Sequence, residues 1–511
     1  MATGSGKNMA HNMAERVTWK QLFKKPQTLQ LPFRLALADE EDFVLCQKMV
    51  RILPKKRIVF SGHWKNQAVI VKLFLEPGRA AAHFDRERSG IQILAESGIP
   101  TPALLYHGQT KRYRIPVLVT EELTDAKDIA TLWEPHLSAG KQSARLMDKL
   151  VLELATQHVM GIRQRDLHFG NFMYKNHKIY TLDGGSMDFY QKPLPEKASL
   201  QHLALFFSQL GTNAKELKHR LLSIYTHARG QRLRKSALRY LLRMTQKHLH
   251  ERIRRYQKKV LRASRHVQTG SRFGLQFWYD KRFASPELTA LLQNPDVFFS
   301  DPKTQILKNG RSSTVIQAGV GEQTFVIKHY NIKNSLHWLR RCFRPSRARH
   351  SWQMAYGLGL AGIATARPVA CIEKHFLGLR GRSFFVMEHI QGNTLTDHLR
   401  TVRADSPEAL QLARRIQVLF DSLYEAGFCQ NDLKATNIMI HKDHPVLIDL
   451  DGMQHFSPEK NNFRKNKKSI ERFMKNWHDR PDLIKLFERE NTHASPIQFC
   501  AQSAQRGLQK P

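Results

Sequence analysis

The sequence predicts an α+β protein made of two tandem domains, each with a small strand-rich lobe followed by a helical lobe. The chain has 511 residues, which is too long for one ordinary domain and suits two or three. In each half, strand-like segments come first and helical segments follow. The third observation is a repeated pattern, Asp-x-x-x-x-Asn with a second Asp twelve residues beyond the Asn. It occurs as Asp166, Asn171 and Asp183, and again as Asp432, Asn437 and Asp449.

Strand-like runs open the first copy. Residues 57–60, 68–74 and 118–123 are rich in β-branched and other apolar residues, as strands are. A helix is predicted from about 79 to 97, because Gly98 and two nearby prolines are stop signals. A second helix over 139–160 precedes Asp166, and a strand over 178–182 leads to Asp183. Residues 196–266 have a helical period.

The second copy repeats this order after a turn-rich passage at 268–271. We expect strands at 304–308, 313–316, 324–328 and 383–388. A basic block at 340–349 enters a helix that ends near Gly362, and another helix spans about 407–426. The predicted division is therefore a flexible leader at 1–30, a first domain at 31–270, a second domain at 271–480 and a tail at 481–511.

The charge of the chain is extreme. Its net charge of +37 and pI near 10.2 favour a polyanionic partner, which could be nucleic acid, an anionic membrane or a phosphorylated substrate. Residues 215–265 contain seventeen Lys or Arg against two Glu. A solvated basic face and a surface for anionic lipid or phosphorylated sugar both explain this stretch. No zinc, helix-turn-helix or RNA-stacking motif supports nucleic acid, so we expect no nucleic-acid partner.

The cysteines and the hydropathy point to a cytoplasmic protein. The five cysteines are scattered and form no Cys-x-x-Cys pair, which argues against a disulfide framework or a zinc site. Residues 1–12 are polar and lack the apolar core of a signal peptide. No apolar run approaches the roughly 18 residues that span a bilayer. We expect a protein that can lie against a membrane without crossing it.

The repeated pattern has a chemical meaning when a strand lysine precedes it. Lys72 ends the strand Ala-Val-Ile-Val-Lys and Lys328 ends Phe-Val-Ile-Lys, and such a lysine can hold nucleotide phosphates. The first Asp of each pattern, Asp166 or Asp432, would accept the proton of an attacking hydroxyl. The Asn and the later Asp would hold Mg²⁺, which prefers oxygen ligands. These predicted metal ligands are Asn171, Asp183, Asn437 and Asp449.

The two copies differ around this set. Glu87, eleven residues before Gly98, is placed to pair with Lys72, whereas the same count back from Gly362 gives Ser351. Lys434, two residues after Asp432, could neutralise a transferring phosphoryl group, and the first copy has His168 there. Asp451 could share or take the metal role of Asp449. We therefore expect the first copy to be the more complete site. The histidines lack metal-ligand spacing, and His83, His168 and His202 are expected at the surface or in loops.

The chain resembles the lipopolysaccharide core kinases of Gram-negative bacteria, which phosphorylate Kdo or heptose of the inner core. The resemblance covers about 50–265 and 303–480. It rests on the stretches Gln-Arg-Asp-Leu-His-Phe-Gly-Asn, Ala-Glu-Ser-Gly-Ile-Pro-Thr-Pro, Ala-Gly-Ile-Ala-Thr-Ala-Arg-Pro-Val-Ala and Leu-Ile-Asp-Leu-Asp-Gly. It implies two protein-kinase-like bilobal domains, ATP as donor and Mg²⁺. It also implies a lipopolysaccharide or lipid-linked sugar acceptor and peripheral attachment at the inner face of the inner membrane.

Three functions remain open at this stage. The leading hypothesis is an ATP-dependent phosphotransferase that acts on a sugar hydroxyl of the lipopolysaccharide core. A protein Ser/Thr kinase is the first alternative, because Asp-Leu-Lys-Ala-Thr-Asn at 432–437 matches the catalytic-loop motif of protein kinases well. Neither copy, however, has a following Ala-Pro-Glu segment. A basic pair of inactive kinase-like domains that acts as a scaffold is the second. Residue patterns do not distinguish the sugar, the number of active copies or the oligomeric state.

Overall fold

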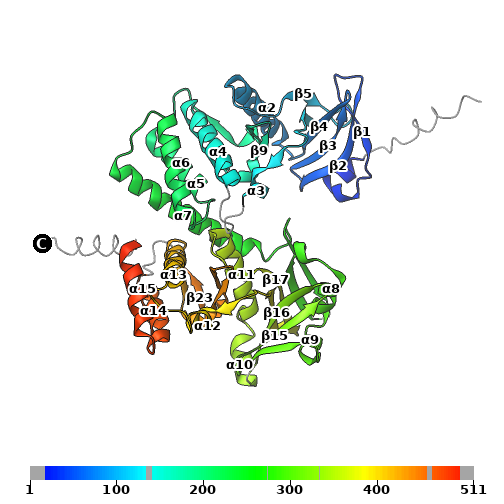
Figure 1. The fold of residues 1–511 in the computed structure, drawn as a ribbon. Helices are drawn as coiled ribbons and strands as arrows, with labels where there is room; N and C mark the ends of the chain where they lie inside the picture. The colour runs from blue at the N-terminus through cyan, green and yellow to red at the C-terminus, as the bar shows by residue number, and fades with distance from the viewer. Residues whose placement is uncertain (1–17, 134–140, 273, 333, 457–462, 495–511) are drawn as a thin grey trace, which may run out of the picture. The chain divides into compact units, whose positions relative to one another are not determined.

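The structure, a computed structural model, describes residues 18–133, 141–272, 274–332, 334–456 and 463–494. The chain divides into two compact units. Of the described residues, unit 1 comprises those up to 206 together with 219–238, and unit 2 comprises 207–218 and those from 239 onward. Each unit combines an antiparallel sheet with a set of helices, so the protein is of the α+β class (Figure 1).

Unit 1 opens with a six-stranded antiparallel sheet in the order β1-β2-β3-β4-β6-β5. Alternate residues of β4, namely Val69, Val71 and Leu73, enter one buried core. Because side chains alternate across a strand, Lys72 lies on the opposite face of this central strand. The strands are β1 (Phe33–Ala36), β2 (Phe43–Leu53), β3 (Arg57–Trp64), β4 (Gln67–Phe74), β5 (Leu104–Gln109) and β6 (Pro116–Glu121).

The helix that faces Lys72 is α2 (Ala80–Glu96), which packs against β4, β5 and β6. It ends where the sequence indicates, because Gly98 adopts a left-handed backbone with φ of 71°. The other helices up to residue 259 are α1 (Trp19–Phe23), α3 (Ile129–Leu132), α4 (Lys141–Val159), α5 (Glu196–Phe207), α6 (Lys215–Ala228) and α7 (Lys235–Lys259).

Unit 2 has a seven-stranded antiparallel sheet in the order β12-β13-β17-β18-β16-β15-β14. Helix α11 (Arg347–Ala361) lies against β17 and β18 (Figure 1) and ends at Gly362, whose φ is 78°. Helix α13 (Pro407–Glu425) starts with proline at its first position after the N-cap Ser406. The strands are β12 (Val267–Arg272), β13 (Leu275–Asp280), β14 (Gln305–Asn309), β15 (Ser313–Val320), β16 (Gln323–Tyr330), β17 (Pro368–Phe376) and β18 (Leu379–Glu388).

The boundaries of the units differ from the predicted division at 270 and 480. The second half of α7 contributes Leu249 and Ile253 to the main core of unit 2, although these residues fall in the predicted first domain. Helix α15 (Pro481–Ala494) contributes Leu483 and Phe487 to the same core, although it falls in the predicted tail. Apolar residues on one face of a long helix bury wherever a partner surface exists, which spacing alone does not reveal.

Small sheets in each unit hold the loops that carry the repeated pattern. In unit 1, β8 (Ile162–Gln164) pairs with β11 (Met187–Phe189), and β7 (Lys127–Asp128), β9 (Phe172–Lys175) and β10 (Lys178–Thr181) form a second small sheet. Unit 2 repeats this arrangement. There β20 (Phe428–Gln430) pairs with β23 (Met453–His455), and β19 (Asn393–Thr394), β21 (Ile438–His441) and β22 (His444–Leu447) form the second sheet.

Unit 2 also contains α8 (Pro286–Gln293), α10 (Ser335–Arg341) and α14 (Phe463–Met474), with the short α9 (Val297–Ser300) and α12 (Leu395–Leu399) between them. Over the described ranges, every helix is too short or too polar to pass through a bilayer.

Candidate functional sites

In unit 1 the strand lysine meets a carboxylate from the facing helix. The ammonium of Lys72 contacts Glu87 on α2, and Arg57 on β3 binds the other carboxylate oxygen at 2.7 Å. The side chain of Glu87 is only 2% exposed. Burial would raise its pKa, but the two cations outweigh this effect and hold the pKa of Glu87 below its usual value. Glu87 is therefore ionised and fixes the position of Lys72.

The loop that carries Asp166 is closed by a side-chain amide. Asn171 donates a hydrogen bond from Nδ2 to the backbone oxygen of Asp166, at 2.8 Å. The amide oxygen of Asn171 is left for another partner. The Asp166 side chain is 75% exposed, and His168 Nε2 lies 3.7 Å from its carboxylate. The loop thus presents a largely exposed carboxylate to solvent, with His168 as its neighbour.

Two glycines after Asp183 bring this loop against α2. Asp183 itself has a left-handed backbone with φ of 61°. A side chain on Gly184 would collide with the helix backbone at Ile91, since its Cβ would lie 2.6 Å from the nitrogen of that residue. A Cβ on Gly185 would lie 3.1 Å from an oxygen of Glu87. Asp183 therefore directly precedes two glycines that pack against α2, the helix that carries Glu87.

A chain of buried rings supports the Asp166 loop from behind. His202 on α5 donates from Nε2 to the backbone oxygen of Gln164, at 2.8 Å, and its Nδ1 lies 2.7 Å from Nε2 of His158. His158 in turn lies 2.6 Å from the hydroxyl of Tyr225. Burial lowers the pKa of His158 well below its usual value, so His158 is neutral. The expectation that His202 is a surface or loop residue is wrong, because this histidine is buried in a helix.

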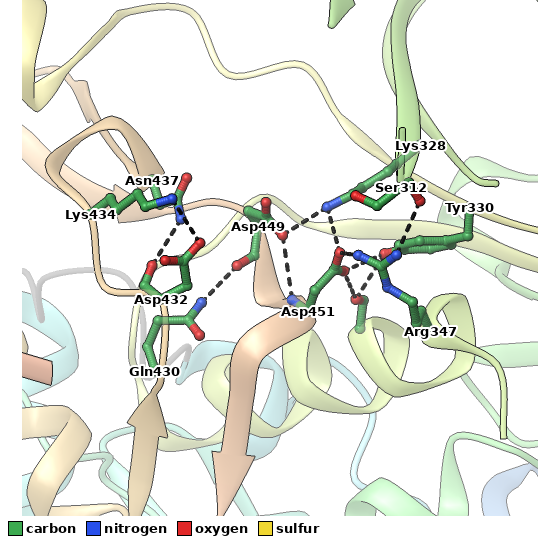
Figure 2. Close-up of polar contacts among 11 residues, drawn as sticks. Ser312, Lys328, Tyr330, Arg347, Gln430, Asp432, Lys434, Asn437, Asp449 and Asp451 are labelled. Atoms are coloured by element: carbon green, nitrogen blue, oxygen red, sulfur yellow. Dashed lines mark hydrogen bonds and ion pairs between the residues drawn. The ribbon is translucent and has the colours of Figure 1, made fainter. Parts of the chain in front are cut away.

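In unit 2 the strand lysine meets two carboxylates of one loop (Figure 2). Lys328 on β16 lies 2.7 Å from Oδ1 of Asp449 and 2.8 Å from Oδ2 of Asp451. Its side chain is 6% exposed. Ser351 does stand on α11 in place of the helix carboxylate, but its hydroxyl donates to Asp451 at 3.0 Å. Lys328 therefore has a carboxylate partner that the count back from Gly362 could not reveal.

Both carboxylate oxygens of Asp451 bind other side chains of the protein. Besides Lys328, it binds Arg347 at 2.6 Å and accepts the hydroxyl of Tyr330 at 2.6 Å (Figure 2). Burial would raise its pKa, but Lys328 and Arg347 hold the pKa of Asp451 below its usual value. Donors occupy both oxygens of Asp451, whereas Lys328 contacts Oδ1 of Asp449, so Oδ2 of Asp449 is the carboxylate oxygen of this loop that is available to a metal ion.

The Asp432 loop of unit 2 repeats the amide closure of unit 1. Asn437 donates from Nδ2 to the backbone oxygen of Asp432 at 3.0 Å, and Gln430 donates to the backbone oxygen of Asp449 at 2.7 Å (Figure 2). The Asp432 carboxylate also has two cationic neighbours. Lys434 lies 3.2 Å away, and Arg472 of α14 lies 2.7 Å away. Sequence patterns pointed to Lys434 but contained no signal for Arg472, which comes from a different element.

The donor atoms suit Mg²⁺ that arrives with a nucleotide. Asp449 offers a carboxylate, and the amide oxygen of Asn437 is free because the hydrogen bond to Asp432 uses the nitrogen. Asp183 and Asn171 provide the same atom types in unit 1. No group of three or more His, Cys, Asp or Glu side chains that could hold a metal ion occurs within the described ranges. Magnesium bound with phosphates needs only one or two protein carboxylates, so these residues fit.

Comparison with known proteins gives one family. Residues 306–493 match the model of the lipopolysaccharide kinase (Kdo/WaaP) family, a segment that runs from β14 to α15 and contains Lys328, Asp432, Asn437 and Asp449. No curated protein matches the chain. The match does not include Asp166, in the copy that the sequence led us to expect as the more complete one. The similarity to the lipopolysaccharide kinase (Kdo/WaaP) family thus covers residues 306–493, which lie in unit 2.

Proposed function

We propose that this protein is an ATP-dependent phosphotransferase whose acceptor is a hydroxyl of heptose or Kdo in the lipopolysaccharide inner core. One observation carries the proposal. The segment that matches the kinase family contains a buried lysine, Lys328, in contact with Asp449, and an Asn437 that closes the Asp432 loop. Phosphoryl transfer depends on positioned positive charge and metal ligands, and this arrangement supplies both.

In unit 2, Asp432 accepts the proton of the acceptor hydroxyl as its oxygen forms a bond to the γ-phosphorus of ATP. The bond between that phosphorus and the β–γ bridging oxygen breaks, and ADP leaves. Lys328 orients the nucleotide phosphates, and Lys434 stabilises charge on the phosphoryl group in transit. Asn437 and Asp449 would hold Mg²⁺, which neutralises phosphate charge when it is bound.

We assign unit 1 as a second kinase-like domain, in tandem with unit 2. Its Asp166 corresponds to Asp432 as base, and Asn171 and Asp183 correspond to the metal ligands. Lys72, held by Glu87, corresponds to Lys328. The antiparallel sheet, the facing helix and the paired small sheets recur in both units in the same chain order, which supports this assignment. The location that follows from such an acceptor is the inner face of the inner membrane, where the net charge of +37 favours anionic lipid.

Mass spectrometry of lipopolysaccharide from cells with and without the gene tests the proposed function. We expect the core oligosaccharide to lose one or more phosphate groups, a mass difference of about 80 Da each, when the gene is absent. Complementation with the intact gene should restore the phosphate, and a copy that carries Asp432→Ala should not. An unchanged core in the deletion strain would overturn the proposal.

A further inference from the structure

A basic hollow opens beside Asp432 in unit 2. It is lined by Lys434 from the Asp432 loop and by Lys468 and Arg472 of α14, with Lys475 just beyond that helix. Glu471 is the acidic side chain in its lining. Four cations therefore face one carboxylate around an open depression, with Asp432 at its edge through its ion pairs with Lys434 and Arg472.

Helical spacing and buried anchors hold the basic residues in place. Lys468, Arg472 and Lys475 follow each other at steps of four and three, so they share one side of the helical segment. The other side is buried, because Phe473 and Trp477 enter the main core of unit 2. The orientation of the basic side is thus set by the core and does not depend on a ligand.

Among the described residues, two of the four cations have a carboxylate partner and two do not. Arg472 and Lys434 share the carboxylate of Asp432. Lys468 and Lys475 make no ion pair with a carboxylate within the described part of the chain. Like charges gathered without counter-charge favour binding of an anion, and phosphate or carboxylate groups are the natural ligands of lysine and arginine clusters.

The corresponding segment of unit 1 lacks this feature. Helix α5 follows β11 as α14 follows β23, but α5 carries a single lysine, Lys197, next to Glu196. On its inner side, His202 supports the Asp166 loop through a backbone bond. Helix α5 therefore has no counterpart of the basic residues of α14, so these residues are not a general requirement of the repeated loop.

We propose that the basic hollow binds an anionic group of the acceptor, a phosphate or a carboxylate on a sugar, next to the hydroxyl that Asp432 deprotonates. This inference rests on the proposed function and adds the class of acceptor to it. An anion that attracts Arg472 also draws its positive charge away from Asp432, which leaves the carboxylate free to accept a proton. The acceptor is then selected by charge as well as by shape.

Binding measurements on the full chain test this proposal without catalysis. Glucose 6-phosphate, glucuronate and glucose are the probes, because they offer a phosphate, a carboxylate and no charge on the same sugar ring. We expect the wild-type protein to bind at least one of the charged sugars and to bind glucose at least tenfold more weakly. The double variant Lys468→Ala/Lys475→Ala should weaken the charged probe by about tenfold or more.

Lys467→Ala is the matched control, because Lys467 neighbours Lys468 on α14 but does not line the hollow. Thermal unfolding should be unchanged in both variants, since the substituted side chains are exposed. An equal loss of affinity for the charged probe in the control and in the double variant would overturn the proposal. Equal affinity of the wild-type protein for charged sugars and for glucose would also overturn it. If the charged probes bind as expected but no phosphoryl transfer occurs, the proposed function fails and the anion site remains.

Discussion

The two strand lysines occupy corresponding places in their sheets but take their carboxylates from different elements. Lys72 in unit 1 contacts Glu87 of the helix, and residue 185 in the loop is glycine. Lys328 in unit 2 contacts Asp451 of the loop, and residue 351 in the helix is serine. The negative charge beside the lysine is thus present in both units. In unit 1 the carboxylate comes from the helix, and in unit 2 it comes from the loop.

Steric contact explains why the helix position (87 or 351) and the loop position (185 or 451) both differ between the units. With Glu87 in place, a Cβ at position 185 would lie 3.1 Å from its carboxylate oxygen, so an aspartate at this position would require Glu87 to shift. With serine at position 351, an aspartate fits at 451 and receives the serine hydroxyl. The comparison teaches that a missing residue in a pattern is weak grounds for an inactive site, because a neighbour in space can replace it.

The largest expected effect separates the two units by activity. Asp432→Ala removes the proposed base of unit 2, and general base catalysis contributes about 10²–10⁴-fold to rate. We expect transfer to purified lipopolysaccharide core to fall by about that factor. Asp166→Ala, the equivalent change in unit 1, leaves Asp432 in place and should therefore retain the transfer that unit 2 carries out. Steady-state assays with ATP and core oligosaccharide check the pair, and the reverse outcome would place the transfer in unit 1.

The second prediction concerns the exchanged carboxylate itself. Asp451→Ala leaves Lys328 and Arg347 with one buried carboxylate fewer, and breaking a buried ion pair costs about 3–5 kcal/mol. We expect a loss of this size in the free energy of unfolding of unit 2, measured by denaturant titration. Asp405→Ala breaks an exposed pair with Arg403 and is the control, for which we expect no measurable change. Equal stability of the two variants would show that Asp451 is not needed.

A third experiment moves the carboxylate back to the helix. Asp451→Gly alone should weaken ATP binding, because Lys328 loses one of the groups that orient it. The double variant Ser351→Glu/Asp451→Gly recreates the arrangement of unit 1 and should recover most of the lost affinity. Titration of ATP into each protein measures the difference. If the double variant binds no better than Asp451→Gly, the two arrangements are not equivalent.

The smallest expected effect is on acid stability, and both units share its cause. In unit 2, burial and the neighbouring His250 lower the pKa of His455 to about 4. Because this pKa is below that of the unfolded chain, the stabilisation is present at neutral pH and is lost as pH falls from about 6.5 towards 4. We expect His455→Gln to reduce the loss of unit 2 stability between pH 7 and pH 5 by about 2 kcal/mol.

Thermal unfolding at the two pH values measures this effect. His478→Gln is the control, because His478 is an exposed residue of the same unit. Parallel pH dependence in wild type and His455→Gln would exclude His455 as the source. Unit 1 should show acid sensitivity of its own, since the pKa of the buried His158 is also lowered.

Much of this architecture could be predicted from residue order alone. The ends of α2 and α11 follow from Gly98 and Gly362, and the contact between Lys72 and Glu87 follows from the strand and helix that carry them. These features are local, or depend on one pairing of elements. The α+β class could also be predicted, because the order of strand-like and helical segments can be recognised in the sequence.

The features that escaped prediction depend on packing between distant segments. Arg472 reaches Asp432 only because α14 folds over the loop, forty residues later in the chain. His202 is buried because its ring bonds to His158 and to the backbone before Asp166. The place of α7 was missed for the same reason, since its apolar residues could face either of two cores. Such contacts are set by tertiary structure and leave no spacing pattern.

The most direct test of the central claim is transfer of label from [γ-³²P]ATP by the purified full chain. Purified core oligosaccharide and a generic protein substrate are offered in parallel, with Mg²⁺ and with excess chelator. We predict label on the oligosaccharide, dependent on Mg²⁺ and absent in Asp432→Ala. Label on the protein substrate alone, or no label on either, would contradict the account.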